Sequence, residues 1–182
     1  MILKINNKSR FISNFLSPLN KLGDSCVCKV TKDGITTLIS TDCRTVVLYG
    51  TYKQEMDCEV PVNLNIPDLG RLTRILQCID DESIELEVTN SFIKYSSSNI
   101  RFTYHLLDDN IITTPKLSVD KIKNIDYTTT FSMPYDSLTN LLKSSTFTVN
   151  INKIYFDTDE TGVYAEINDK QFANVDNIRL KL

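Results

Sequence analysis

Hydrophobic side chains recur at helical spacing in three segments of the chain. The segments are residues 8–22, 67–79 and 135–144, and their apolar residues lie three or four positions apart. We therefore predict one amphipathic helix in each segment. Pro18 should end or kink the first helix near Ser17, because proline has no N–H and its ring clashes with the preceding turn.

Each predicted helix is followed by a strand, a turn and a strand. The predicted hairpins pair 26–30 with 35–39, 84–88 with 92–95, and 154–156 with 163–167. Asp33-Gly34 in the first turn is typical of tight hairpins. A third strand follows each hairpin, and a leading strand precedes each helix. The third strands are 45–52, 100–106 and 175–182, and the leading strands are 2–5, 58–65 and 125–133.

The chain thus repeats one unit, a strand, a helix and three strands. Residues 107–124 are polar, contain Pro115 and show no periodicity, so we predict a linker there. We expect a first domain of two units in residues 1–106 and a second domain with one unit in residues 125–182. The predicted fold class is α+β, with helices on one face of antiparallel sheets. A structure built from pairs of units would lack a partner for the third.

Positive charge gathers on the predicted helices although the whole chain is acidic. The chain has 20 Lys and Arg against 23 Asp and Glu, but the helices carry six basic and only two acidic residues. The basic residues of the helices are Lys8, Arg10, Lys21, Arg71, Arg74 and Lys143. A polyanion facing the helices explains this partition. A solvated polar face is the alternative for each single helix. So few cations favour weak, salt-sensitive phosphate contacts.

Nothing in the sequence indicates catalysis. The only histidine is His105, and no phosphate-binding glycine loop is present. Cys26 and Cys28 are close in sequence, but there is no second close cysteine pair to complete a set of metal ligands. We therefore predict no catalytic residue, no cofactor and no metal. The odd number of cysteines argues against a disulfide framework. No apolar run approaches the length of a membrane span or signal peptide, so we expect a cytoplasmic protein.

Two segments carry a resemblance to a known family. Residues 62–78 (VNLNIPDLGRLTRILQC) look like the strand and second helix of the first domain in DNA sliding clamps. Residues 41–48 (TDCRTVVL) look like the turn before the outer strand of that domain. The resemblance covers the whole chain at low identity. It is closest to the phage T4-type clamp and more distant from proliferating cell nuclear antigen (PCNA). Clamps of this family carry a fourth unit, so the chain is either a fragment or a short form.

The resemblance implies a processivity factor, a protein that encircles duplex DNA without reading its sequence and tethers a DNA polymerase. It also implies a homo-oligomeric ring, a trimer, a clamp-loader ATPase as partner and, for a phage protein, the cytoplasm of the infected host. The alternative is a non-enzymatic structural or adaptor protein, such as a virion component, and an enzyme comes third.

The same resemblance, with the charge pattern, singles out two sets of residues. The expected DNA contacts are Lys8, Arg10, Asn14, Lys21, Arg71, Arg74, Gln77 and Lys143. The expected groove for a partner's apolar peptide is formed by Arg44, Thr45, Val46, Ile111 and Ile112. For the isoleucine pair, anchoring of the linker to its own sheet is an equally weighted alternative.

Overall fold

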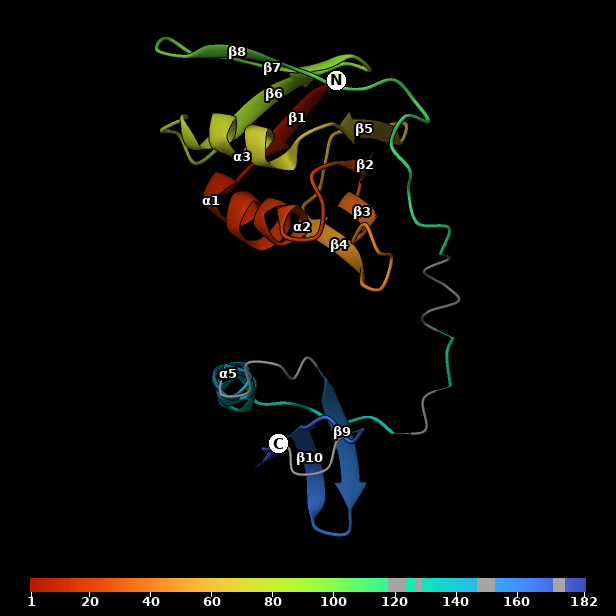
Figure 1. Ribbon diagram of the computed structural model, residues 1–182. Helices are drawn as coiled ribbons and strands as arrows, with labels where there is room; N and C mark the ends of the chain where they lie inside the picture. Colours follow the sequence, from red (N-terminus) through yellow and green to blue (C-terminus); the bar gives the residue numbers. More distant parts are fainter. Residues whose placement is uncertain (118–123, 127–128, 147–152, 172–175) are drawn as a thin grey trace. The chain divides into compact units, whose positions relative to one another are not determined.

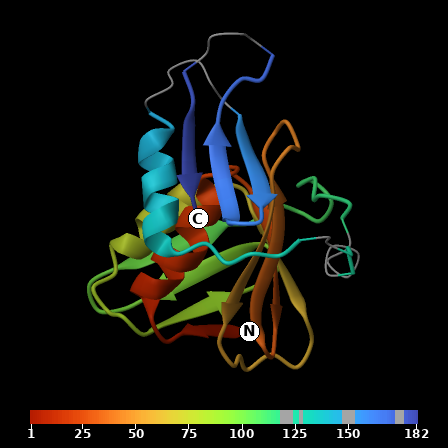
Figure 2. The ribbon, with the colours of Figure 1, turned by 90° about the horizontal axis from the view of Figure 1, so that it is seen from below.

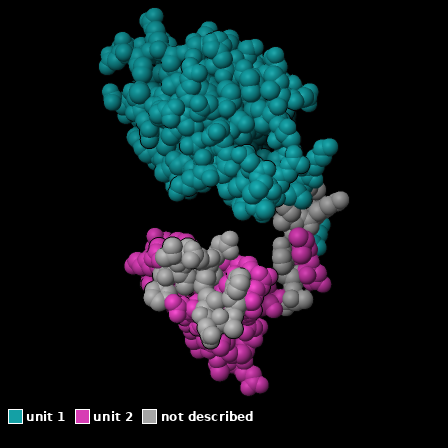
Figure 3. All heavy atoms as spheres, in the orientation of Figure 1, with its two compact units in different colours: residues 1–124 teal, residues 125–182 magenta. Residues whose placement is uncertain are grey.

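The computed structural model describes the 182-residue chain except for residues 118–123, 127–128, 147–152 and 172–175. The chain divides into two compact units, residues 1–124 and 125–182 (Figure 3). Residues 107–117 and 124, the described part of the expected linker, belong to the first unit. No helix within the described ranges is long and apolar enough to cross a membrane.

The described residues of unit 1 form two four-stranded antiparallel sheets (Figure 1). One sheet has the order β4-β3-β2-β5 and the other the order β1-β6-β7-β8. The strands are β1 (Ile2–Ile5), β2 (Cys26–Thr31), β3 (Gly34–Ser40), β4 (Val47–Lys53), β5 (Val62–Ile66), β6 (Ile84–Val88), β7 (Phe92–Ser96) and β8 (Arg101–His105). Each lies within a few residues of a predicted strand.

The two repeats of unit 1 exchange their leading strands. Strand β1, which leads into the first helix, pairs with β6 of the second repeat, and Ile5 lies opposite Ile84. Strand β5, which leads into the second helix, pairs with β2 of the first repeat, and Ile66 lies opposite Cys26. Each sheet therefore contains three strands of one repeat and one strand of the other, so neither repeat completes its sheet alone.

The first helix is continuous but changes its winding. It consists of α1 (Lys8–Phe11), a π-helical turn η1 (Ile12–Leu16) and α2 (Ser17–Asn20). The helix runs through Pro18, where we had predicted an end or a kink. The Ser17 N–H donates to the Ile12 carbonyl five residues earlier, and this wider turn makes room for the proline ring.

The second helix, α3 (Leu69–Gln77), packs beside η1 and α2 (Figure 1). The Asp68 side chain caps it by accepting a 2.7 Å hydrogen bond from the Arg71 N–H. Its apolar stripe is fully buried in one core that also holds the first helix and both sheets. The stripe consists of Leu69, Leu72 and Leu76.

The described residues of unit 2 form one helix and one three-stranded antiparallel sheet with the order β11-β10-β9 (Figure 2). The elements are α5 (Tyr135–Ser144), β9 (Ile154–Asp159), β10 (Gly162–Ile167) and β11 (Ile178–Lys181). A small core forms around Leu141, Ala165 and Ile167. The predicted α+β class with antiparallel sheets is confirmed in both units.

One predicted strand is wrong in its described part. Residues 125, 126 and 129–133 form no strand, and residues 127–128 lie outside the described chain. In unit 1 the equivalent leading strands form by pairing with the other repeat. The described part of unit 2 holds only one repeat, so this segment has no such edge to join. The predicted last strand is shorter, Ile178–Lys181, and residue 175 lies outside the description.

Candidate functional site

The first helix and α3 of unit 1 present a basic helix face, which we define by exposed polar residues of the first helix, its C-terminal end and α3. These residues are Arg10, Asn14, Lys21, Arg71, Arg74 and Gln77. The four ion pairs among the described residues all involve other side chains. The four cations of this face therefore point to solvent without a described carboxylate partner, which leaves them free to attract an anion.

Local folding positions these cations. Because Leu69, Leu72 and Leu76 turn inward, Arg71 and Arg74 must turn outward on the opposite side of α3. A Cβ placed on Gly70 would lie 3.4 Å from the Asn20 side chain, so α3 approaches the end of α2 closely. The polar faces of the two helices thus lie next to one another on one unit.

Tyr104 fixes the start of α3, a role that sequence reasoning missed. Its hydroxyl donates to the Asp68 carbonyl at 2.7 Å and accepts from the Asp68 N–H at 3.0 Å. Burial raises the pKa of Tyr104 to about 12, so the hydroxyl stays protonated at physiological pH. The helix that carries Arg71 and Arg74 is therefore held to strand β8.

Lys8 does not belong to the basic helix face. The side chain is buried, and its ammonium donates to the Ile79 carbonyl just beyond α3. Its backbone N–H donates to the Glu82 carbonyl at 2.8 Å. Hydrogen bonds from the Ser9 hydroxyl and N–H lower the pKa of the Glu82 carboxyl. These hydrogen bonds thus hold the start of the first helix to the loop after α3. Because its ammonium is buried and hydrogen-bonded there, Lys8 is not placed for the expected contact with DNA.

Lys143 lies on the second unit. It is exposed in the last turn of α5, where the carbonyl end of the helix dipole favours a cation. The acidic residue of this helix, Asp136, lies in its first turn. Both charges are therefore placed where the helix dipole stabilises them, which is also the placement expected of a solvated surface helix.

A groove of about 660 Å³ lies between sheet strands of unit 1 and residues 112–117. Among the five residues expected there, Arg44 and Ile112 line it, whereas Thr45, Val46 and Ile111 do not. Apolar lining comes mainly from residues that sequence reasoning missed. These are Val27, Leu38, Ile39, Val47, Pro115 and Leu117. The segment 112–117 has no regular structure, so no periodicity in the sequence marks which of its side chains face the sheet.

The turn beside this groove is held by local hydrogen bonds. The Thr41 N–H donates to the Val46 carbonyl at 3.0 Å, and Arg44 adopts a left-handed backbone with φ of 57°. The exposed Cys43 thiol lies 3.4 Å from the Thr41 hydroxyl and 3.0 Å from that of Thr45. These hydrogen bonds lower the pKa of Cys43 to about 7.

Two further thiols meet in the core rather than at a surface. The sulfurs of Cys26 and Cys28 are 3.5 Å apart, and both residues are buried on the inner face of β2. The hydrogen bond between them lowers the pKa of Cys26 and raises that of Cys28. Among the described residues no group of three or more His, Cys, Asp or Glu side chains is placed to hold a metal ion.

Comparison with known proteins identifies the fold. No protein-family model matches the chain, and no curated protein does. Among solved structures, PCNA from Thermococcus kodakaraensis matches 100% of this chain and 72% of its own, with a TM-score of 0.67 and 16% identity. A. fulgidus PCNA, solved with the C-terminal region of FEN-1, matches 100% of this chain and 71% of its own, with a TM-score of 0.66 and 13% identity.

The chain has a PCNA-like sliding-clamp fold. The predicted clamp fold class is thereby confirmed. The paired repeats of unit 1, with two helices beside each other and two sheets, are the part of the clamp fold that carries both the basic helix face and the groove.

Proposed function

We propose that the chain is the subunit of a DNA sliding clamp of the phage T4 type. Such a clamp is a homo-oligomeric ring that encircles duplex DNA in the cytoplasm and tethers a DNA polymerase during replication. The observation that supports this best is the basic helix face, which carries four cations without a described carboxylate partner in a clamp-fold chain of net charge −3. The role is that of a binding protein and not of an enzyme.

The chemistry of the basic helix face suits sliding. Arginine and lysine side chains on a helix surface contact phosphate oxygens, which are the same at every base pair, so such contacts carry no sequence information. A few exposed cations give weak contacts that exchange readily with counterions. A closed ring needs no tighter grip, because it is held by its topology. A clamp-loader ATPase would open and close the ring, and a trimer is the stoichiometry that the resemblance implies.

Retention on DNA with blocked ends tests this function. The protein is mixed with linear duplex DNA that carries biotin at both ends, streptavidin is added, and the sample is washed at high salt. A ring that has threaded onto the DNA stays bound only when streptavidin blocks the ends. We expect at least about tenfold more protein on blocked than on open DNA after a wash that screens phosphate contacts. Equal retention on both would contradict the clamp and favour a structural or adaptor protein.

We further propose that the groove receives a short apolar peptide of the polymerase or the loader. Replacing Ile112, which lines the groove, with aspartate should weaken binding of a synthetic polymerase C-terminal peptide by about 10- to 100-fold. Losing the burial of one apolar side chain costs about 1.5–3 kcal/mol, and each 1.4 kcal/mol is about tenfold in affinity. Fluorescence anisotropy of the labelled peptide measures the change.

Ile111→Asp is the matched control, because Ile111 is the neighbouring isoleucine, is 59% exposed and does not line the groove. It should bind the peptide like the wild type. If both variants bind normally, residues 112–117 only anchor the linker to its own sheet. If both lose binding equally, the peptide does not enter the groove as proposed.

A further inference from the structure

Asn65 is buried on the outer face of its sheet, where a polar side chain normally meets water. In strand β5 the side chains of Leu64 and Ile66 belong to the core, so Asn63 and Asn65 point outward by the alternation of a strand. Asn63 is exposed, as this alternation predicts, but Asn65 is only 6% exposed. Another segment must therefore cover Asn65, and its amide needs hydrogen-bond partners there.

The segment that covers Asn65 is the start of the predicted linker. The Leu107 N–H donates to the Asn65 carbonyl at 3.0 Å. The Asn65 side-chain amide donates to the Leu107 carbonyl at 3.1 Å and to the Asp109 carboxylate at 2.9 Å. Within the described ranges, these three are the hydrogen bonds that join residues 107–117 to the rest of unit 1. All three involve Asn65, and the two side-chain bonds use both N–H groups of its amide.

The segment held by Asn65 leads directly into the wall of the groove. Asn110 follows Asp109 with a left-handed backbone, φ of 67°, which asparagine adopts more readily than most residues. Ile112, two residues further on, is the first linker residue that lines the groove. Val27 lies opposite Asn65 in the β2–β5 pair and lines the groove from the sheet. The hydrogen bonds of Asn65 are therefore made beside the groove, just before its second wall begins.

The second wall depends on how the linker starts. Residues 112–117 form no helix or strand, and no hydrogen bond among the described residues joins them to the sheet. A segment of this kind has many conformations of similar free energy unless it is held at one end. A wall that is already in place saves a bound peptide the cost of ordering it. The contact at Asn65 thus bears on the affinity of the groove.

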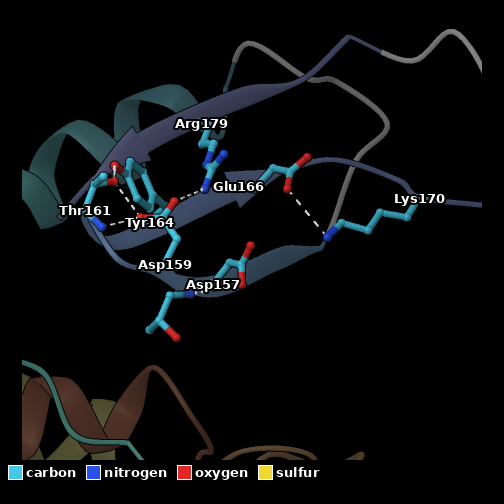
Figure 4. Close-up of polar contacts among 8 residues, drawn as sticks. Asp157, Asp159, Thr161, Tyr164, Glu166, Lys170 and Arg179 are labelled. Atoms are coloured by element: carbon cyan, nitrogen blue, oxygen red, sulfur yellow. Dashed lines mark hydrogen bonds and ion pairs between the residues drawn. The ribbon is translucent and has the colours of Figure 1, made fainter.

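The described residues of unit 2 carry polar side chains on the same face of their sheet. Strand β10 is the equivalent of β3, and Glu166 lies between two buried residues of β10 as Leu38 does in β3. Leu38 lines the groove, whereas Glu166 pairs with Lys170 at 3.5 Å (Figure 4). Beside it, Arg179 pairs with Asp159 at 3.1 Å (Figure 4). These side chains satisfy one another, so the apolar surface that a linker can cover lies on the sheet that holds Asn65.

We propose that Asn65 is the positioning residue of the groove. By holding Leu107 and Asp109 it fixes the start of the linker, and so it sets the second wall in the form that an apolar peptide enters. The inference rests on the proposed function of the groove and adds a residue that prepares this site without lining it. Loss of the contact should weaken peptide binding and leave DNA binding unchanged, because the basic helix face belongs to other elements.

Asn65→Asp tests the proposal with a side chain of nearly the same shape. The carboxylate cannot donate to the Leu107 carbonyl, and it repels the Asp109 carboxylate. We expect the affinity for the labelled polymerase C-terminal peptide, measured by fluorescence anisotropy, to fall at least about tenfold. Asn63→Asp is the matched control, because it adds the same charge on the exposed part of the same strand face, and it should bind like the wild type. The double variant Asn65→Asp with Asp109→Asn restores a donor between the two side chains and should recover most of the affinity.

Amide hydrogen exchange of the full 182-residue chain, followed by NMR, tests the contact without any peptide. In Asn65→Asp the Leu107 amide should exchange at least about tenfold faster. The Leu106 amide donates to the Ser91 carbonyl at 2.8 Å and should keep its wild-type rate. Asp109→Ala makes a milder change on an exposed residue, so it keeps the test valid if Asn65→Asp does not fold. It should speed exchange at Leu107 about fivefold, whereas its exposed neighbour variant Asp108→Ala should not.

Two results would overturn the role of Asn65. One is a wild-type exchange rate at Leu107 in both Asn65→Asp and Asp109→Ala, and the other is equal peptide affinity of Asn65→Asp and Asn63→Asp. Failure of the proposed groove function looks different. In that case the wild type binds no peptide, while faster exchange at Leu107 in the two variants still supports the hold of Asn65 on the linker.

Discussion

Replacing both Arg71 and Arg74 with glutamate should weaken duplex DNA binding by about 50-fold or more at about 0.1 M salt. Each phosphate contact makes the affinity fall with close to the first power of the salt concentration. Losing two contacts therefore lowers this exponent by nearly two. Both side chains are exposed and outside the described ion pairs, so folding should be unaffected. A salt titration followed by fluorescence anisotropy should show the slope of log affinity against log salt falling by about two units.

The control variant carries the same change of charge elsewhere on unit 1. Lys29 and Arg101 are exposed on β2 and β8, and replacing both with glutamate also changes the net charge from −3 to −7. If the helices face the DNA, this variant should keep most of the affinity and the wild-type salt slope. An equal loss in both variants would show that only net charge matters, and the basic helix face would then have no special role.

Replacing Gly34 with alanine should destabilise unit 1 by about 3 kcal/mol or more. Gly34 follows the β2–β3 turn with φ of 134°, a backbone conformation that costs other residues about 1–3 kcal/mol. A Cβ there would also lie 2.1 Å from the Tyr52 carbonyl oxygen of β4, so backbone must move, which adds about 1–3 kcal/mol. Guanidinium unfolding followed by circular dichroism measures the loss.

Gly70→Ala makes the same change in a helix. The nearest atoms to its Cβ would be side-chain atoms at 3.4 Å, an ordinary contact, and the backbone of α3 suits alanine. This variant should be about 0.5–1 kcal/mol more stable than the wild type. If Gly34→Ala unfolds at the wild-type denaturant concentration, the hairpin tolerates a side chain and the tight β3–β4 contact at Gly34 is not required.

The sequence was sufficient for the elements whose signals are local. The period of the apolar residues located α3 and α5, and Asp33-Gly34 located the first hairpin. The exchange of β1 and β5 between repeats was not foreseen, because strand partners depend on contacts between distant residues. The same limit explains the wrong strand at 125–133. That segment has the composition of a strand, but a strand also needs an edge to pair with.

In the candidate site, too, local signals were predictable from the sequence and contacts between distant residues were not. Arg71 and Arg74 were placed correctly on an exposed face because the buried leucines of α3 fix where they point. Lys8 was expected to contact DNA because of its charge, but it precedes Phe11 and Ile12 of the apolar stripe by three and four residues, so it faces the core and its ammonium donates to the Ile79 carbonyl just beyond α3. In the groove, Ile112 lines the wall and Ile111 does not. Without helix or strand periodicity, no rule on the sequence separates these two neighbours.

The exchange of β1 onto β6 affects how the protein is made. The amino group of Met1 donates to the Val88 carbonyl, 87 positions along the chain. Strand β1 therefore cannot complete its pairing with β6 until Val88 has been synthesised. At ribosomal speed this delay is roughly 4–17 s. Meanwhile the apolar side chains of residues 2–5 and the edge of β2 are open to the same segments of neighbouring nascent chains. We therefore expect domain swapping between nascent chains to be a route of misassembly, and slow folding of unit 1 to follow from its distant pairings.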